Sequence, residues 1–232
     1  HHFTRIRDAL ERGDEQAARE ILAEWRQVDA TEVPRSEVVR HVIEYSVLSA
    51  HRHVFGVLFW FAVLAALGLG PAGAVFYRVA EYLSRYWSRK SIGGAAPVSE
   101  RLQYSAKQAW VVIDWLPARM TALGFAVVGS FEEAIDGWRF HTKHFPNDND
   151  GVILAATAGA INVRLGGETL KMREDLVVAP IGDDEDAWQE PGVTPGREAE
   201  TGHLRSVVGL VWRSVVVWML LLALLSLARL LG

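Results

Sequence analysis

Residues Val207–Leu231 read VVGLVWRSVVVWMLLLALLSLARLL, and this stretch decides the class of fold. Arg213 and Arg229 are its only charged residues, and both side chains can extend toward lipid head groups. An apolar helix of about 20 residues spans a bilayer core of roughly 30 Å. A soluble chain of 232 residues has too small a core to bury such a helix on every side. The stretch therefore predicts a transmembrane helix whose partner is the lipid bilayer.

The composition agrees with a membrane protein that also has extramembrane parts. Hydrophobic residues make up 50% of the chain and charged residues 22%, with a formal net charge of -4. This charge balance gives no case for a nucleic-acid partner. Because the chain has no cysteine, disulfides, thiolate catalysis and cysteine-bound metal are excluded. The sequence names no cofactor. It starts at His1 without a methionine, and we expect further polypeptide upstream.

Apolar periodicity and breaker residues predict an all-α, polytopic integral membrane protein with amphipathic and extramembrane helices. Composition changes along the chain divide it into four segments. The segments are 1–53, with amphipathic and extramembrane helices; 54–129, with membrane helices and a Gly-Pro corner; 130–206, with extramembrane helices and an acidic flexible loop; and 207–232, the C-terminal transmembrane helix.

The Gly-Pro corner separates two predicted helices. The run Val54–Leu69 is uncharged, and Gly70-Pro71 breaks it. The next helix, Ala72–Trp87, has an apolar side and a charged side that includes Arg78 and Glu81. The sequence leaves open whether this second helix crosses the membrane or packs inside the protein. Further helices are predicted over 99–129, 131–144 and 152–165.

The distribution of charge predicts how a multi-pass protein is oriented in its membrane. Basic residues prevail in the loop 88–107, which the positive-inside rule assigns to the cytoplasm. Acidic residues dominate over 130–202, so this part is expected on the other side. Small residues in Ala155–Ala160 allow close approach of helices. A homo-oligomer and a larger membrane complex both stay open as partners.

Asp114 and Arg119 are the strongest candidates for a functional site because they lie in an apolar helix. Ionisable groups at membrane depth act on ligands or form structural ion pairs. In the structural alternative, Asp114 pairs with Arg119, or with Arg78 from the neighbouring helix. Glu81 and Glu44 complete the predicted cluster, which either binds a ligand or stabilises the fold.

Metal binding is not expected. His41 and Glu44 lie three residues apart on one helix face, a spacing that metal sites in helical bundles use. No complementary pair follows on another apolar helix, and the chain has neither an H-E-x-x-H motif nor a phosphate-binding glycine loop with lysine. The residue pattern therefore predicts no metal ligand and leaves any catalytic residue unassigned.

Several short blocks occur in the order of one membrane-protein family. They include Leu58-Phe59-Trp60, Gly70-Pro71-Ala72-Gly73-Ala74, Tyr77-Arg78 and Asp114-Trp115-Leu116-Pro117-Ala118-Arg119-Met120-Thr121. These blocks resemble the CobD/CbiB family of cobalamin biosynthesis and its relative AmpE, a proposed inner-membrane modulator of β-lactamase induction. The W-L-P-A-R-x-T block is quite specific, and the Asp-Trp-x-Pro-x-Arg form is closer to AmpE. The resemblance covers residues 8–130 well and implies a multi-pass protein of the bacterial inner (cytoplasmic) membrane.

The resemblance implies a reaction, since synthase members join aminopropanol or its phosphate to adenosylcobyric acid as an amide. Acidic positions of their pattern are replaced here by Leu48, Arg52, Trp110 and Val111. Activating a carboxylate develops negative charge, which enzymes offset with cationic clamps or with metal held by carboxylates. We therefore expect a non-synthase member that acts in binding, in signalling or as an accessory membrane component. The alternative is an adenosylcobinamide-phosphate synthase-type amide ligase.

Overall fold

The computed structural model describes residues 2–26, 30, 33–92, 100–168, 170 and 192–231. In these residues, helices are joined by turns and accompanied by two isolated β-bridges, so the all-α prediction is confirmed. The elements are α1 (His2–Glu11), α2 (Glu15–Arg26), α3 (Arg35–Ala50), the π-helical turn η1 (His51–Phe55), α4 (Gly56–Ala66), α5 (Ala72–Ile92), α6 (Glu100–Val128), α7 (Phe131–His141), the 3₁₀ turn η2 (Thr142–His144), α8 (Asp148–Ile161) and α9 (Thr201–Leu231).

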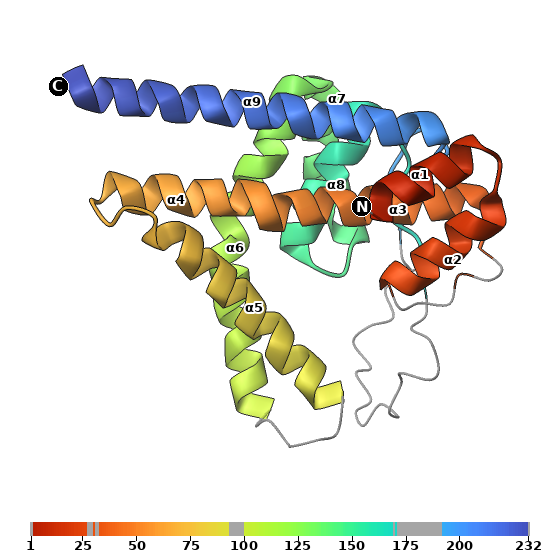
Figure 1. The fold of residues 1–232 in the computed structure, drawn as a ribbon, viewed down its shortest axis with the longest axis horizontal. Helices are drawn as coiled ribbons and strands as arrows, with labels where there is room; N and C mark the ends of the chain where they lie inside the picture. The colour runs from red at the N-terminus through yellow and green to blue at the C-terminus, as the bar shows by residue number, and fades with distance from the viewer. Residues whose placement is uncertain are drawn as a thin grey trace.

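Three helical stretches of the described chain are long and apolar enough to cross a membrane: Arg35–Ala66, Arg101–Val128 and Thr201–Ala228. The first stretch joins α3, η1 and α4 into one continuous helix. Figure 1 shows α9 running alongside this helix and in the same direction, while α6 crosses behind it. These stretches make the chain a multi-pass membrane protein, as the hydropathy of the sequence predicts.

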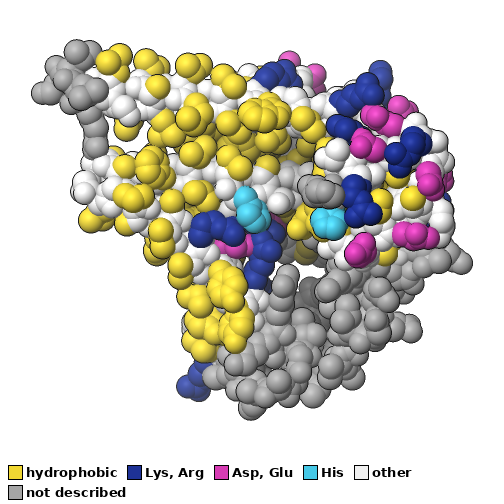
Figure 2. All heavy atoms as spheres, in the orientation of Figure 1, with side chains coloured by type: hydrophobic (Ala, Val, Ile, Leu, Met, Phe, Trp, Pro, Cys, Tyr) yellow, Lys and Arg dark blue, Asp and Glu magenta, His cyan; other side chains and the backbone are white. Residues whose placement is uncertain are grey.

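The buried core lies at one end of the molecule, where α1, α2, α3, α8 and the start of α9 meet (Figure 1). Its fully buried apolar side chains include Ile6, Leu22, Ile43, Ile153 and Leu204. At the other end, apolar side chains of α4 and α9 point outward, and Figure 2 shows apolar atoms covering this region. Charged atoms gather instead over α1 and α2. A bilayer around the apolar end would remove these side chains from water.

The predicted Gly-Pro corner is confirmed, because α4 ends at Ala66 and α5 begins at Ala72. Gly73 allows the two helices to pack tightly after the corner. A Cβ atom at this position would lie 1.9 Å from the carbonyl oxygen of Trp60. Only glycine permits so close an approach of two backbones.

Small residues also bring α7 and α8 together. A Cβ at Gly159 would lie 2.0 Å from the Glu133 carbonyl oxygen, and one at Gly137 would lie 2.4 Å from the Ala155 carbonyl oxygen. The predicted helix 152–165 in fact spans Asp148–Ile161. It starts earlier because the Asn147 side chain accepts a hydrogen bond from the Asn149 backbone N–H, and it ends at Asn162 in the left-handed conformation.

Two further boundaries differ from prediction. Helix α5 continues to Ile92, beyond the predicted end at Trp87. Part of the acidic flexible loop predicted within 130–206 is ordered by the bridges Val163 to Arg197 and Gly166 to Val193, and α9 already begins at Thr201. The other predicted loop residues, at 93–98 and 171–191, lie outside the described residues. The division of the chain into four segments stays a prediction.

Candidate functional site

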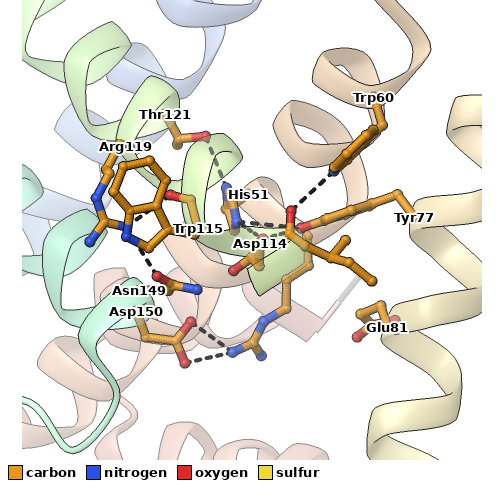
Figure 3. A network of polar contacts seen from close by, with 12 residues as sticks. His51, Trp60, Tyr77, Glu81, Asp114, Trp115, Arg119, Thr121, Asn149 and Asp150 are labelled. Atoms are coloured by element: carbon orange, nitrogen blue, oxygen red, sulfur yellow. Dashed lines mark hydrogen bonds and ion pairs between the residues drawn. The ribbon is translucent and has the colours of Figure 1, made fainter. Parts of the chain in front are cut away.

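Asp114 lies at the centre of a buried polar network that links three helical elements (Figure 3). Its Oδ1 atom is 2.9 Å from His51 Nε2 and accepts a hydrogen bond of 2.7 Å from the Tyr77 hydroxyl. His51 Nδ1 is 2.9 Å from the Thr121 hydroxyl. All four side chains are at most 2% exposed. If His51 Nε2–H donates to Asp114 and the Thr121 hydroxyl donates to Nδ1, every donor in the network has an acceptor.

Local features of the sequence position these side chains. His51 opens the π-helical turn η1, a wide turn of the kind that recurs at functional sites. Gly56 makes room for Tyr77, because a Cβ at position 56 would lie 2.3 Å from the Tyr77 ring. The phenol can therefore pass α4 and reach Asp114 on α6.

Pro117 creates a second link between helices. Proline has no N–H, so the Ile113 carbonyl oxygen, four residues earlier in α6, lacks its helical donor. The Trp60 indole of α4 supplies the missing hydrogen bond, with Nε1 at 3.1 Å from that oxygen (Figure 3). Trp60 of one sequence block thus supplies the hydrogen bond that Pro117 of another block removes.

Charged pairs surround the Asp114 network on the more accessible side. Arg52 Nη2 lies 2.7 Å from Asp150 Oδ2, which joins η1 to α8. Glu81, itself 4% exposed, binds Arg78 at 3.1 Å and also pairs with Arg85. The side chains of Arg78 and Arg85 are each 40% exposed. Figure 2 shows basic, acidic and histidine atoms together in the middle of this face.

Arg119 has a different environment because it donates hydrogen bonds to neutral groups. Its Nη1 atom donates to the Trp115 carbonyl oxygen at 2.8 Å and to Asn149 Oδ1 at 3.1 Å. The guanidinium also lies 4.0 Å from the centre of the Trp115 ring. Asn149 donates in turn to the Val111 carbonyl oxygen at 3.0 Å, so α8 holds this part of α6 in place.

Four of the five predicted site residues come together here: Asp114, Arg119, Arg78 and Glu81. The pairing of Asp114 with Arg119 or Arg78 is not observed, since Asp114 binds His51 and Tyr77 instead. Glu44 belongs to a separate cluster, where it accepts hydrogen bonds from Arg40 at 3.0 Å and from the Gly166 N–H at 2.8 Å.

The sequence prediction missed six members of the network: His51, Arg52, Tyr77, Thr121, Asn149 and Asp150. Tyr77 and Thr121 do occur in the blocks that carry the family resemblance. In the sequence, His51 and Arg52 belong to the basic stretch 51–53, and His51 is considered with His41 and Glu44 only as a metal cluster that is not expected. Asp150 reads as part of a turn. Within the described residues, no group of three or more His, Asp or Glu side chains could hold a metal ion.

Fold and site define a helical membrane protein in which apolar helices enclose a network of acids, arginines and a histidine. The chain belongs to the CobD/CbiB family, because residues 1–194 match the family described as CobD/CbiB protein. No solved structure matches the chain.

Curated relatives carry the name cobalamin biosynthesis protein CobD. The protein from Stutzerimonas stutzeri is 28% identical over 95% of this chain and 66% of its own length. The protein from Chromobacterium violaceum is 34% identical over 72% of this chain and 50% of its own length. That from Mycobacterium tuberculosis is 30% identical over 77% of this chain and 55% of its own length. The chain thus spans about half to two thirds of these relatives.

The expectation of a non-synthase protein in binding or signalling is wrong, because relatives over most of the chain are named for cobalamin biosynthesis. The prediction failed because it looked for an acidic residue at each motif position separately. Arg52, which replaces an acidic position of the synthase pattern, pairs with Asp150 from α8. Glu81 and Asp114 supply further carboxylates from α5 and α6. The folded chain therefore gathers acids that the linear pattern does not display.

Proposed function

We propose that this protein acts in cobalamin biosynthesis as a synthase-type amide ligase of the inner membrane. In this role it joins aminopropanol, or its phosphate, to adenosylcobyric acid. The observation that carries the proposal is family membership over residues 1–194, together with relatives named cobalamin biosynthesis protein CobD. The membrane helices and the polar network support it.

The mixed charge of the network suits the joining of an amine to a carboxylate. An aliphatic amine is a cation at neutral pH and must lose one proton before it can attack an acyl carbon, and a second proton as the amide forms. One carboxylate oxygen of the acyl donor leaves in the same reaction, as phosphate when a phosphoryl donor activates the acid. The Asp150 carboxylate, 18% exposed at the side chain, can bind the ammonium group and accept a proton. Arginines can bind the carboxylate of the acyl donor and offset the negative charge that develops during its activation.

Accessibility assigns different roles within the network. Arg78 and Arg85, both 40% exposed at the side chain, are placed to contact a substrate. Arg119 can contact an anion because its hydrogen bonds to Trp115 and Asn149 go to neutral oxygen atoms. Asp114, His51 and Thr121 are almost completely buried, so we assign them to positioning: they hold α3–η1, α5 and α6 in register around the site.

Complementation tests the proposal. The protein is expressed in a strain that lacks its own synthase, on medium where growth requires cobalamin made from adenosylcobyric acid. We expect growth without added cobinamide. Failure to grow, with the protein present in the membrane fraction and growth restored by cobinamide, would contradict the proposal. The assignment to the inner membrane, a homo-oligomeric state and the likeness to AmpE remain predictions.

A further inference from the structure

The hairpin formed by α4 and the start of α5 is apolar along both arms and across its tip. No Asp, Glu, Lys, Arg or His occurs from Val54 to Tyr77. At the tip, Leu67 is 70% exposed and Leu69 is 58% exposed. A turn that emerges into water after crossing a membrane normally carries polar turn residues. The tip of this hairpin has none, so water is an unfavourable surrounding for it.

The two arms of the hairpin lie side by side at their charged ends. Arg52 precedes the apolar run and Arg78 follows it, and Arg78 Nη1 lies 3.4 Å from the Arg52 carbonyl oxygen. Each arginine has an acidic partner close by, Asp150 for Arg52 and Glu81 for Arg78. The charged groups that flank the apolar run therefore meet on one side of the hairpin.

The arms are too short to cross a bilayer from their charged ends. From Arg52 to the end of α4 at Ala66 the first arm has 15 residues, and from Ala72 to Arg78 the second arm has seven. At 1.5 Å per residue the longer arm extends about 22 Å, which is less than a hydrocarbon core of about 30 Å. A hairpin whose base lies at the head groups therefore reaches its tip inside the hydrocarbon.

Part of the backbone at the tip makes its hydrogen bonds within the hairpin. Gly68, with φ 82°, follows the end of α4 in the left-handed conformation. Its N–H donates to the Ala65 carbonyl at 3.1 Å, and the Leu69 N–H donates to the Leu64 carbonyl at 2.9 Å. These two bonds form the Schellman arrangement, and Pro71 has no N–H to satisfy. Irregular backbone in lipid needs such internal partners.

We propose that α4 and α5 form a re-entrant hairpin, which enters and leaves the bilayer from one side and inserts its tip into the hydrocarbon interior. The apolar stretch that ends at Ala66 then enters the membrane without crossing it. The charged groups at the base, including Arg52 and Arg78, face the membrane surface on that side. This inference rests on the hairpin alone and does not depend on the reaction proposed above.

Single-cysteine labelling tests the hairpin, and the absence of native cysteine from the chain makes each introduced thiol unambiguous. Leu69→Cys probes the tip. Arg12→Cys, at an exposed turn residue, and Tyr86→Cys, at a side chain 44% exposed on α5, are the water-facing controls. We expect a membrane-impermeant maleimide to label both controls from the same face of sealed vesicles. The tip thiol should resist labelling from either face and react after unfolding in dodecyl sulfate.

Two outcomes of the labelling would overturn the proposal: reaction of the tip thiol in intact vesicles of either orientation, or reaction of the two controls from opposite faces. A nitroxide on the same cysteine gives an independent measure. At Leu69→Cys it should be relaxed more by dissolved oxygen than by a water-soluble nickel complex, and at Arg12→Cys the order should be reversed. The same order at both positions would contradict insertion of the tip.

Discussion

A buried carboxylate is tolerated only where donors replace the water it has lost. Asp114 obtains two donors from different helices, the His51 ring and the Tyr77 hydroxyl, and both bonds reach the same oxygen atom. Removing the carboxylate therefore affects more than one residue. It leaves a buried N–H and a buried O–H without an acceptor.

We expect Asp114→Ala to lower stability in detergent by roughly 2–5 kcal/mol, because it leaves two buried donors unsatisfied. Asp114→Asn should lose less, since its amide oxygen can still accept from Tyr77 or His51. Thermal unfolding in a mild detergent measures the difference. Equal midpoints for the wild type and Asp114→Ala would show that these bonds do not stabilise the fold.

Gly56→Ala should lower stability by about 1–3 kcal/mol, because the core must shift to accept an added methyl group. The new Cβ would lie 2.3 Å from the fully buried Tyr77 ring. Gly209→Ala is the matched control in α9, where no heavy atom lies within 4 Å of the added Cβ. The same thermal unfolding assay applies. A loss of stability in the control as large as that in Gly56→Ala would argue against steric conflict with Tyr77.

At the scale of elements, α4 and α6 are joined at a local irregularity of α6. Pro117 removes one hydrogen bond from α6, and Trp60 replaces it from α4. A carbonyl without any donor inside an apolar helix pair would be unfavourable. The proline in the W-L-P-A-R-x-T block and the tryptophan of the L-F-W block therefore depend on each other physically.

A double-mutant cycle measures this dependence. Trp60→Phe should lower stability by about 1–3 kcal/mol, because the Ile113 carbonyl then has no donor. In a Pro117→Ala background the helix regains its own N–H at position 117, so Trp60→Phe should have a smaller effect there. The free energy of unfolding of the four proteins gives the coupling. Identical effects of Trp60→Phe in both backgrounds would refute the link.

At the scale of the whole molecule, the sequence predicts elements better than contacts. The apolar run Val207–Leu231 and the corner at Gly70-Pro71 follow from local composition, and both agree with the structure. The polar network does not follow, because its members are distant in sequence. His51 is 63 residues from Asp114 and 70 from Thr121, and no local pattern specifies how helices bring them together.

The expectation of a non-synthase function was wrong for the same reason, because residues distant in sequence meet only in the folded chain. A missing acid at one motif position says little when another helix can supply a carboxylate, as Asp150 does for Arg52. The acidic residues available to a site are therefore better counted in the folded polar network than at motif positions along the sequence. In the network, acids and arginines lie at the base of apolar helices, which suits a reaction between an amine and a carboxylate at a membrane surface.

The most direct test of the account is the amide product itself. A strain without its own synthase is supplied with adenosylcobyric acid, and the cobinamide-type product is measured by mass spectrometry. We predict product with the wild-type protein, at least tenfold less with Arg78→Gln, and unchanged product with Arg205→Gln, a control at a side chain 74% exposed. Absence of product while the wild-type protein is present in the membrane would contradict the account.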